Sequence, residues 1–191
     1  MTIGWDPELE LGFANSVTRT IGGLRIEVVA GNLVDQPDLD AIVGLADVED
    51  GRAQSLLLQT PQAGLEKPLA FRSLLMPDGM RPRRWVIYSY QAEVPQDQAD
   101  HVIAACYSSA LQLVEQSGAM SVGLAAPPPG ALGRSIRAAA LAVMEAIRQE
   151  APFLVNLRLV RLVLPTMEAY DAYGKVLVEA APADVEERTL H

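Results

Sequence analysis

The chain has 191 residues, half of which are apolar, and a formal net charge of −9. This length suits one domain with a sizeable core, and the acidic balance argues against non-specific binding to nucleic acid, which needs Lys and Arg to neutralise phosphates. A single cysteine and two histidines exclude an internal disulfide framework and Cys-based zinc sites, and they argue against a metal centre or a Ser-His-Asp triad.

No apolar run of the sequence is long enough to cross a bilayer. The run from 157 to 164 is interrupted by Arg158 and Arg161, and the N-terminus carries acidic residues where a signal peptide would carry bases. We therefore expect a cytoplasmic protein without membrane contact. One domain is expected over residues 1–181, with an N-terminal hairpin strand added to its core, and the acidic tail 182–191 is expected to be frayed.

The first half of the chain alternates short β-rich runs with turn residues. Gly22-Gly23 lies between two alternating runs and predicts a hairpin. The nearly continuous apolar run from 40 to 46 is typical of a strand covered on both faces. Pro77-Asp78-Gly79 predicts a turn between two antiparallel strands. The expected elements are strands at 15–20, 25–29, 40–46, 69–75 and 84–90, and a short helix at 52–58.

The second half of the chain alternates helical and β patterns. Apolar residues recur at helical spacing from 99 to 114, and Gly118 suits the left-handed position after a helix. Thr166 is a candidate N-cap for a final helix. Strands are expected at 121–126 and 157–164, and further helices at 136–147 and 167–180. This order predicts an α/β fold, a three-layer α/β/α sandwich with a mixed central sheet.

Two strand ends open into loops suited to an anion. The first is at 28–33, and the second is the Pro-Gly loop at 127–133. Prolines have no N–H, so donation by the second loop must come from Gly130, Ala131, Leu132 and Gly133, beside the positive end of the next helix. A pyrophosphate fits such a loop. The alternative is a tight strand-to-helix turn without a ligand.

The order of several short motifs resembles the macro domain, over about residues 24–180. The matching segments are Val28-Val29-Ala30-Gly31-Asn32-Leu33, Asp40-Ala41-Ile42-Val43-Gly44-Leu45-Ala46-Asp47, Trp85-Val86-Ile87-Tyr88, Ala105-Cys106-Tyr107-Ser108-Ser109-Ala110-Leu111 and Ser121-Val122-Gly123-Leu124 with Gly130-Ala131-Leu132-Gly133. The resemblance implies an α/β/α sandwich that binds ADP-ribose and related metabolites, and some macro domains hydrolyse ADP-ribosyl or acetyl-ADP-ribose esters.

The resemblance also implies roles for individual residues. Asn32, followed by Leu33, occupies the position of the aspartate that accepts a hydrogen bond from the adenine amino group. Ala46 and Asp47 stand in the segment that contacts the distal ribose, and Asp47 is the candidate catalytic base. The alternative for Asp47 is a turn residue or a helix N-cap. Leu132 stands where the family places an aromatic residue near the distal ribose.

Three functions follow, in order of preference. The first is binding of ADP-ribose or a related nucleotide diphosphate, with weakened or altered specificity because side-chain contacts are replaced while backbone contacts are kept. The second is a macro-like fold retained as a scaffold or a unit of homo-oligomerisation. The third is hydrolysis of ADP-ribosyl or O-acetyl-ADP-ribose esters. A small-molecule nucleotide is thus the expected partner, and neither a cofactor nor a metal is expected.

Overall fold

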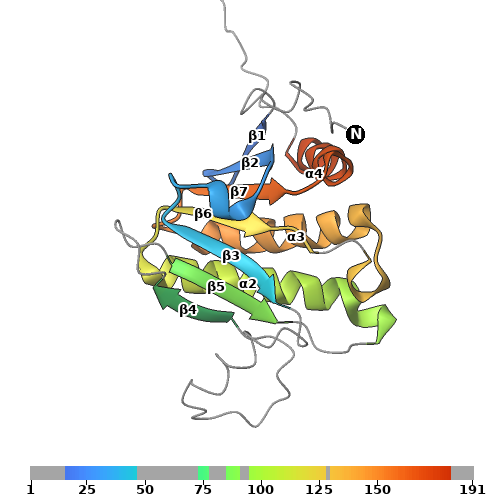
Figure 1. Cartoon of the computed structure of the whole chain (residues 1–191), viewed down its shortest axis with the longest axis horizontal. Coiled ribbons are helices and arrows are strands. Elements are labelled where there is room, and N and C mark those ends of the chain that lie inside the picture. Colours follow the sequence, from blue (N-terminus) through green and yellow to red (C-terminus); the bar gives the residue numbers. More distant parts are fainter. Residues whose placement is uncertain (1–15, 47–72, 78–84, 91–94, 128–129, 182–191) are drawn as a thin grey trace, which may run out of the picture.

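The computed structural model describes residues 16–46, 73–77, 85–90, 95–127 and 130–181. Its strands form one seven-stranded sheet in the order β1-β2-β7-β6-β3-β5-β4 (Figure 1). β1 pairs antiparallel with β2 and β4 with β5, while the other neighbours are parallel. The strands are β1 Val17–Ile21, β2 Leu24–Ala30, β3 Ala41–Ala46, β4 Ser73–Pro77, β5 Trp85–Tyr90, β6 Ser121–Ala125 and β7 Leu159–Leu164.

Three long helices and four single turns complete the described structure. The helices are α2 Ala99–Ser117, α3 Ile136–Glu150 and α4 Met167–Ala180, and the 3₁₀ turns are η2 Leu33–Asp35, η3 Gln96–Gln98, η4 Ala131–Gly133 and η5 Ala151–Phe153. The Oγ of Ser135 accepts a hydrogen bond from the N–H of Ala138 and caps α3. The Oγ1 of Thr166 accepts one from the N–H of Ala169 and caps α4, as the sequence predicted. Gly118 ends α2 with φ of 75°.

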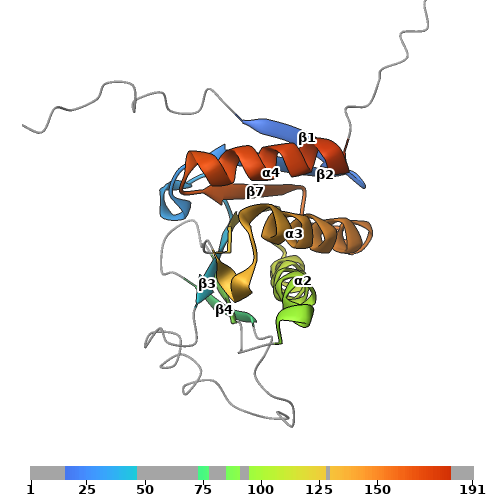
Figure 2. The same ribbon diagram turned by 90° about the vertical axis from the view of Figure 1, so that its right-hand side faces the viewer.

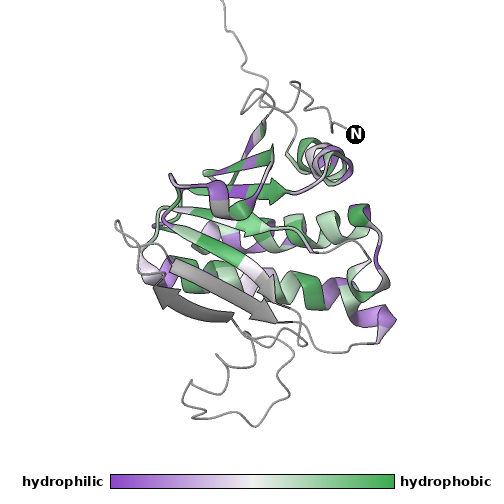
Figure 3. Ribbon diagram, in the orientation of Figure 1, coloured by the Kyte–Doolittle hydropathy of each residue, from purple (hydrophilic) through white to green (hydrophobic). Residues whose placement is uncertain are grey.

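One face of the sheet carries the helices. Alternate strand residues such as Ile26, Val122 and Val160 are fully buried, and they belong to the same apolar cluster as Tyr107 of α2 and Val143 of α3. Figure 2 shows α4 lying along β7 and β2, with α3 beside α2. Figure 3 shows hydrophobic residues along β2, β3, β6 and β7, and those that belong to the apolar cluster face the helices.

The segment 31–40 crosses the opposite face of the sheet. Leu39 is 2% exposed, and its Cδ1 lies 2.7 Å from where a Cβ would stand on Gly123 of β6. The Cδ1 of Leu33 lies 3.0 Å from the same point. The missing side chain at Gly123 therefore lets this segment approach the sheet closely.

The predicted fold class is confirmed: the chain is an α/β sandwich built on a mixed sheet. The hairpin at Gly22-Gly23 forms, with φ of 57° and 85° at the two glycines. The antiparallel pair predicted at 69–75 and 84–90 forms as β4 and β5, and the first strand extends to Pro77. The predicted helix at 52–58 and the tail at 182–191 lie outside the described residues.

Candidate functional site

The loops expected to bind a ligand leave the sheet at one edge. β2, β7, β6, β3 and β5 are parallel, so their carboxyl ends lie together. In the register, Ala30 pairs with Leu164 and Ala125 with Val163. Asn32 therefore follows β2 at the same edge where Pro165 follows β7 and the η4 turn follows β6. Such an edge is where ligands bind in open α/β sheets.

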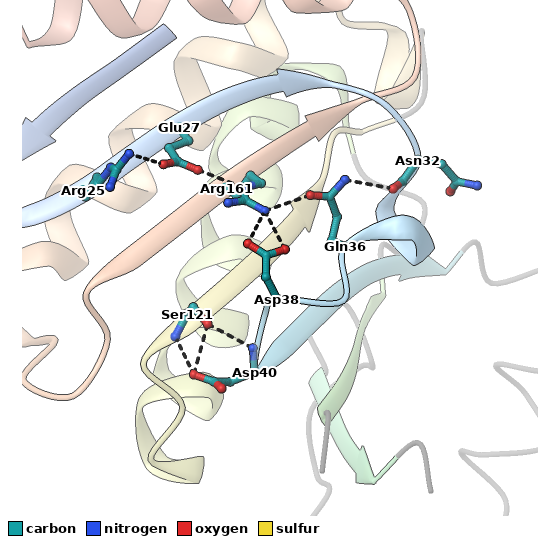
Figure 4. A network of polar contacts seen from close by, with 8 residues as sticks. All are labelled: Arg25, Glu27, Asn32, Gln36, Asp38, Asp40, Ser121 and Arg161. Atoms are coloured by element: carbon teal, nitrogen blue, oxygen red, sulfur yellow. Dashed lines mark hydrogen bonds and ion pairs between the residues drawn. The ribbon is translucent and has the colours of Figure 1, made fainter. Parts of the chain in front are cut away.

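Asn32 is exposed and stands at the beginning of the η2 turn. Its carbonyl accepts hydrogen bonds from the Asp35 N–H at 3.1 Å and from Nε2 of Gln36 at 3.3 Å. In Figure 4 its side-chain amide points away from Gln36. The backbone of Asn32 is thus held, while its side chain extends toward the outside of the segment.

A polar network under the 31–40 segment fixes Gln36 in turn. Arg161 of β7 donates from Nη1 to Oε1 of Gln36 and to both carboxylate oxygens of Asp38, each at 2.9 Å. Its Nε donates to Oε2 of Glu27 on β2 at 2.8 Å, and Glu27 also pairs with Arg25 (Figure 4). Burial by itself lowers the pKa of Arg161, but the hydrogen bonds to Glu27 and Asp38 raise it above its ordinary value.

The η4 turn has an unusual backbone for its sequence. Gly130, Leu132 and Gly133 have φ of 78°, 51° and 70°. Two hydrogen bonds close the turn. The N–H of Gly133 donates to the carbonyl of Gly130 at 2.8 Å, and the N–H of Arg134 donates to the carbonyl of Ala131 at 3.0 Å.

Leu132 is strained at this position. A left-handed conformation costs a non-glycine residue about 1–2 kcal/mol. Its half-buried side chain packs against the apolar cluster of the core, which holds the turn in place. Gly133 is closely approached by Gln96, whose Nε2 lies 2.5 Å from where a Cβ would stand. The turn is thereby anchored on both sides.

Arg134 follows the turn and forms an ion pair with Asp100 of α2. Its Nε donates to Oδ1 at 2.5 Å and its Nη2 to Oδ2. The hydrogen bond from Arg134 holds the pKa of Asp100 below its ordinary value. This two-pronged contact fixes the plane of the guanidinium beside the η4 turn.

A small cavity of about 50 Å³ lies between the first turns of α3 and α4. We call it the α3/α4 cavity. Its walls include Ala126, Pro127, Ala139 and Ala169, with Arg134 and the exposed Thr166 among the lining residues. Tyr173 also lines the cavity and is 1% exposed. Its hydroxyl is buried, and the part of the chain that the structure describes offers it no hydrogen-bond partner.

A second buried tyrosine lies close to the first. The Tyr107 hydroxyl donates to the carbonyl of Ala125, the last residue of β6, at 2.5 Å. Burial, and then the proximity of Tyr173, raise the pKa of Tyr107 well above its ordinary value. Burial likewise raises the pKa of Tyr173, so both phenols remain neutral at physiological pH.

Several predicted residues are brought to one edge and others are not described. Asn32 and Leu33 follow β2, the four residues Gly130, Ala131, Leu132 and Gly133 follow β6 on the other side of β7, and Ala46 is the last residue of β3. Asp47 lies outside the described residues. Sequence reasoning missed Arg134, Arg161 and Tyr173. The only signal for Arg161 was a charge inside an apolar strand, whereas Tyr173 has the spacing of an ordinary core residue.

The described residues contain neither a group of side chains suited to a metal ion nor a helix suited to span a membrane. No group of three or more His, Cys, Asp or Glu side chains is placed to hold a metal ion in these parts of the chain. None of the described helices combines the length and apolarity needed to span a bilayer.

Comparison with solved structures identifies the fold. The Oceanobacillus iheyensis macrodomain with ADP superimposes with a TM-score of 0.70 at 21% identity, over 86% of this chain and 96% of the other. The same macrodomain with MES bound gives the same values. The chain has the macro domain fold. The Trypanosoma brucei macrodomain in complex with ADP-ribose matches this macro fold with a TM-score of 0.59 at 22% identity, over 80% and 68% of the two chains. No protein-family profile and no curated protein matches the sequence.

Proposed function

We propose that this macro fold binds ADP-ribose or a related nucleotide diphosphate at the carboxyl edge of its sheet. The observation that carries the proposal is the η4 turn, in which Gly130, Leu132 and Gly133 have a left-handed backbone and which follows β6 at the edge where Asn32 follows β2. Oceanobacillus and Trypanosoma macrodomains of the same fold bind ADP and ADP-ribose, which supports the choice of ligand.

The diphosphate would lie against the η4 turn. Adjacent N–H groups in a turn form a concave donor surface for anions, and the N-terminus of α3 adds a positive partial charge. These donors belong to the backbone and do not depend on side-chain identity. This explains how binding would persist although Leu132 replaces the aromatic residue that the family places there.

The adenine would lie beside Asn32, with altered selectivity. A carboxylate only accepts hydrogen bonds, whereas the amide of Asn32 both accepts and donates. The amide can therefore pair with an amino group or, after rotation, with a carbonyl group on the base. Recognition of adenine is weaker than a carboxylate would give, because the bond lacks charge assistance.

Calorimetry with ADP-ribose tests the proposal through one matched pair of variants. Gly130→Asn places a side chain on the η4 turn, and asparagine tolerates the left-handed backbone at φ of 78°. Gly118→Asn is the control, since Gly118 has φ of 75° and, like Gly130, no atom within 4 Å of the point where a Cβ would stand. We expect Gly130→Asn to weaken binding at least tenfold and Gly118→Asn to leave it unchanged. Absence of heat at millimolar ligand contradicts the proposal.

Self-association is a second candidate, favoured by an apolar groove between β1 and α4. The groove measures about 380 Å³ and is lined by Val17, Tyr170 and the exposed Val178. Charged Asp171, Lys175 and Glu179 accompany these residues and offer both signs to a symmetric copy. Sedimentation analysis should show a wild-type dimer that Val178→Asp converts to a monomer, and a monomeric wild type at 100 μM refutes this candidate. Hydrolysis depends on Asp47 and is not proposed.

A further inference from the structure

We propose that the α3/α4 cavity is a second anion subsite that binds a phosphoryl group through the hydroxyl of Tyr173. The inference deepens the proposed function and rests on it, because Pro127 and Arg134, which flank the η4 turn in the chain, both line the cavity. A ligand held at the turn could therefore extend a further phosphoryl group into this cavity.

The hydroxyl of Tyr173 is the group that indicates a missing ligand. It is buried, no hydrogen-bond partner is found for it among the described residues, and the side chain that carries it lines the cavity. Buried polar groups in folded proteins are nearly always hydrogen-bonded, so an unsatisfied hydroxyl calls for an occupant that supplies the bond. Since burial raises the pKa of Tyr173, the phenol keeps its proton and can donate it to an anionic oxygen.

Tyr107 lies beside the end of β6 that borders the cavity. Tyr107 bonds to the carbonyl of Ala125, and it is close enough to Tyr173 for the two phenols to influence each other. Ala125 directly precedes Ala126 and Pro127, which line the cavity. The Tyr107 hydroxyl therefore lies at the carboxyl end of β6, beside residues that line the cavity together with Tyr173.

The surroundings of the cavity favour negative charge. α3 and α4 both begin beside it, and helices of 15 and 14 residues present a positive partial charge at their first turns. Arg134 also lines the cavity. Asp100 occupies its Nε and Nη2, and within the described residues no partner is found for Nη1, which is left to donate. Two helix ends, one guanidinium and one phenol thus surround a single space.

The size of the cavity suits a group larger than one water molecule. A water needs only about 10–15 Å³ of such space, and the cavity offers about 50 Å³. Its walls are small because three alanines, Ala126, Ala139 and Ala169, contribute to them. We expect a space of this size to hold a phosphoryl group rather than a base or a ribose.

Titration with inorganic phosphate, followed by calorimetry, tests the subsite. We expect saturable binding to the wild type and at least tenfold weaker binding to Tyr173→Phe. Tyr170→Phe is the matched control on the same helix, because Tyr170 lines the groove beside β1 and not this cavity. The melting temperature of Tyr173→Phe should equal or exceed that of the wild type, since the removed hydroxyl has no partner. A purely structural tyrosine would instead lower it.

A second arm distinguishes free phosphate from a phosphoryl group on a nucleotide. ADP and ADP carrying an additional 2′-phosphate are compared on the wild type and Tyr173→Phe. If the wild type prefers the ADP that carries the 2′-phosphate and Tyr173→Phe abolishes this preference, the subsite binds a phosphoryl group of the nucleotide. If the wild type binds both nucleotides equally and still binds free phosphate through Tyr173, the subsite binds the free ion.

The inference is overturned if the wild type shows no saturable phosphate binding or if Tyr173→Phe binds phosphate equally well. ADP-ribose binding that depends on Gly130 but not on Tyr173 would leave the proposed function standing while this subsite fails. If the protein binds phosphate through Tyr173 but does not bind ADP-ribose, the subsite stands and the proposed function fails.

Discussion

Arg161 and Glu27 are direct neighbours in the register of β7 and β2, and the Nε of Arg161 donates to Oε2 of Glu27 at 2.8 Å. Their side chains are only 14% and 8% exposed. A charge pair at this depth stabilises the fold only while both partners remain, because either charge alone is poorly solvated. The pair also lies beneath the 31–40 segment that carries Asn32 (Figure 4).

Arg161→Met should therefore destabilise the protein by about 3 kcal/mol, the range found when one member of a buried pair is removed. The double variant Arg161→Met with Glu27→Met should recover most of that loss, because the two charges that lose a partner, on Asp38 and Arg25, are on exposed side chains. Urea denaturation of the wild type, both single variants and the double variant gives the coupling energy. Additive single effects would show that the pair is not coupled.

Glu115 should make stability depend on acid pH. Burial raises its pKa, but hydrogen bonds from the N–H groups of Asn156, Leu157 and Val155 outweigh this and hold the pKa below its ordinary value. A lowered folded-state pKa contributes stability that is present above the unfolded-state value and is lost as pH falls through the folded-state value. Glu115→Gln should cost about 1–2 kcal/mol at pH 7.

The difference between wild type and Glu115→Gln should shrink as pH falls below the ordinary glutamate pKa, because the wild-type carboxylate then becomes protonated. Thermal melts from pH 7 to pH 3 measure this. Glu150→Gln is the control, since Glu150 bonds only to the exposed Gln112 among the described residues. A gap that stays constant across this range contradicts the assignment.

Tyr107→Phe and Tyr173→Phe should have opposite effects on stability. Tyr107→Phe removes a buried hydrogen bond to Ala125 and should cost about 1–3 kcal/mol. Tyr173→Phe removes a hydroxyl without a partner and should be neutral or stabilising. Chemical denaturation of both variants provides the comparison, and equal losses would mean that Tyr173 is bonded in solution.

Gly123→Val should push the 31–40 segment away from the sheet. The new side chain would overlap Cδ1 of Leu39 and Leu33, and overpacking of this kind costs about 1–3 kcal/mol. Gly123→Ala should cost less, because leucine ends can shift by a few tenths of an ångström. If Asn32 contributes to the ligand site, ADP-ribose affinity should fall in the same order. Affinity unchanged in the valine variant would separate this segment from binding.

Asn32→Asp should increase discrimination between bases. A carboxylate accepts from the amino group of adenine but repels the carbonyl of hypoxanthine, whereas an amide can serve both. The ratio of ADP to IDP affinity should be within about tenfold in the wild type and should rise in the variant by a further factor of about ten, as expected for one charge-assisted bond. An unchanged ratio would place the base away from residue 32.

The architecture could be predicted from local patterns because each element carries its own signal. The hairpin at Gly22-Gly23, the cap at Thr166 and the helix stop at Gly118 all involve residues close in sequence. The strand predicted to end at residue 75 continues to Pro77, the last residue of β4. A proline is typical of a turn, but it is tolerated here because β4 lies at an edge of the sheet.

The polar parts of the site could be predicted only in part. The glycines of the turn at 130–133 indicate that turn directly, but Arg161 joins residues more than 120 positions away in the sequence. Tyr173 resembles any apolar helix position until its neighbours are known. Which distant side chains pair depends on the order of the strands in the sheet, and local sequence patterns do not predict that order.

The position of β7 has a consequence for how the protein is made. This strand is the last in the chain among those described, yet it lies between β2 and β6 and joins them. During synthesis on the ribosome, Asn32 and the η4 turn would emerge well before the strand that brings their edges together. A nascent chain that ends before about residue 164 cannot complete the sheet, so the edge that carries Asn32 and the η4 turn is assembled only after β7 has been synthesised.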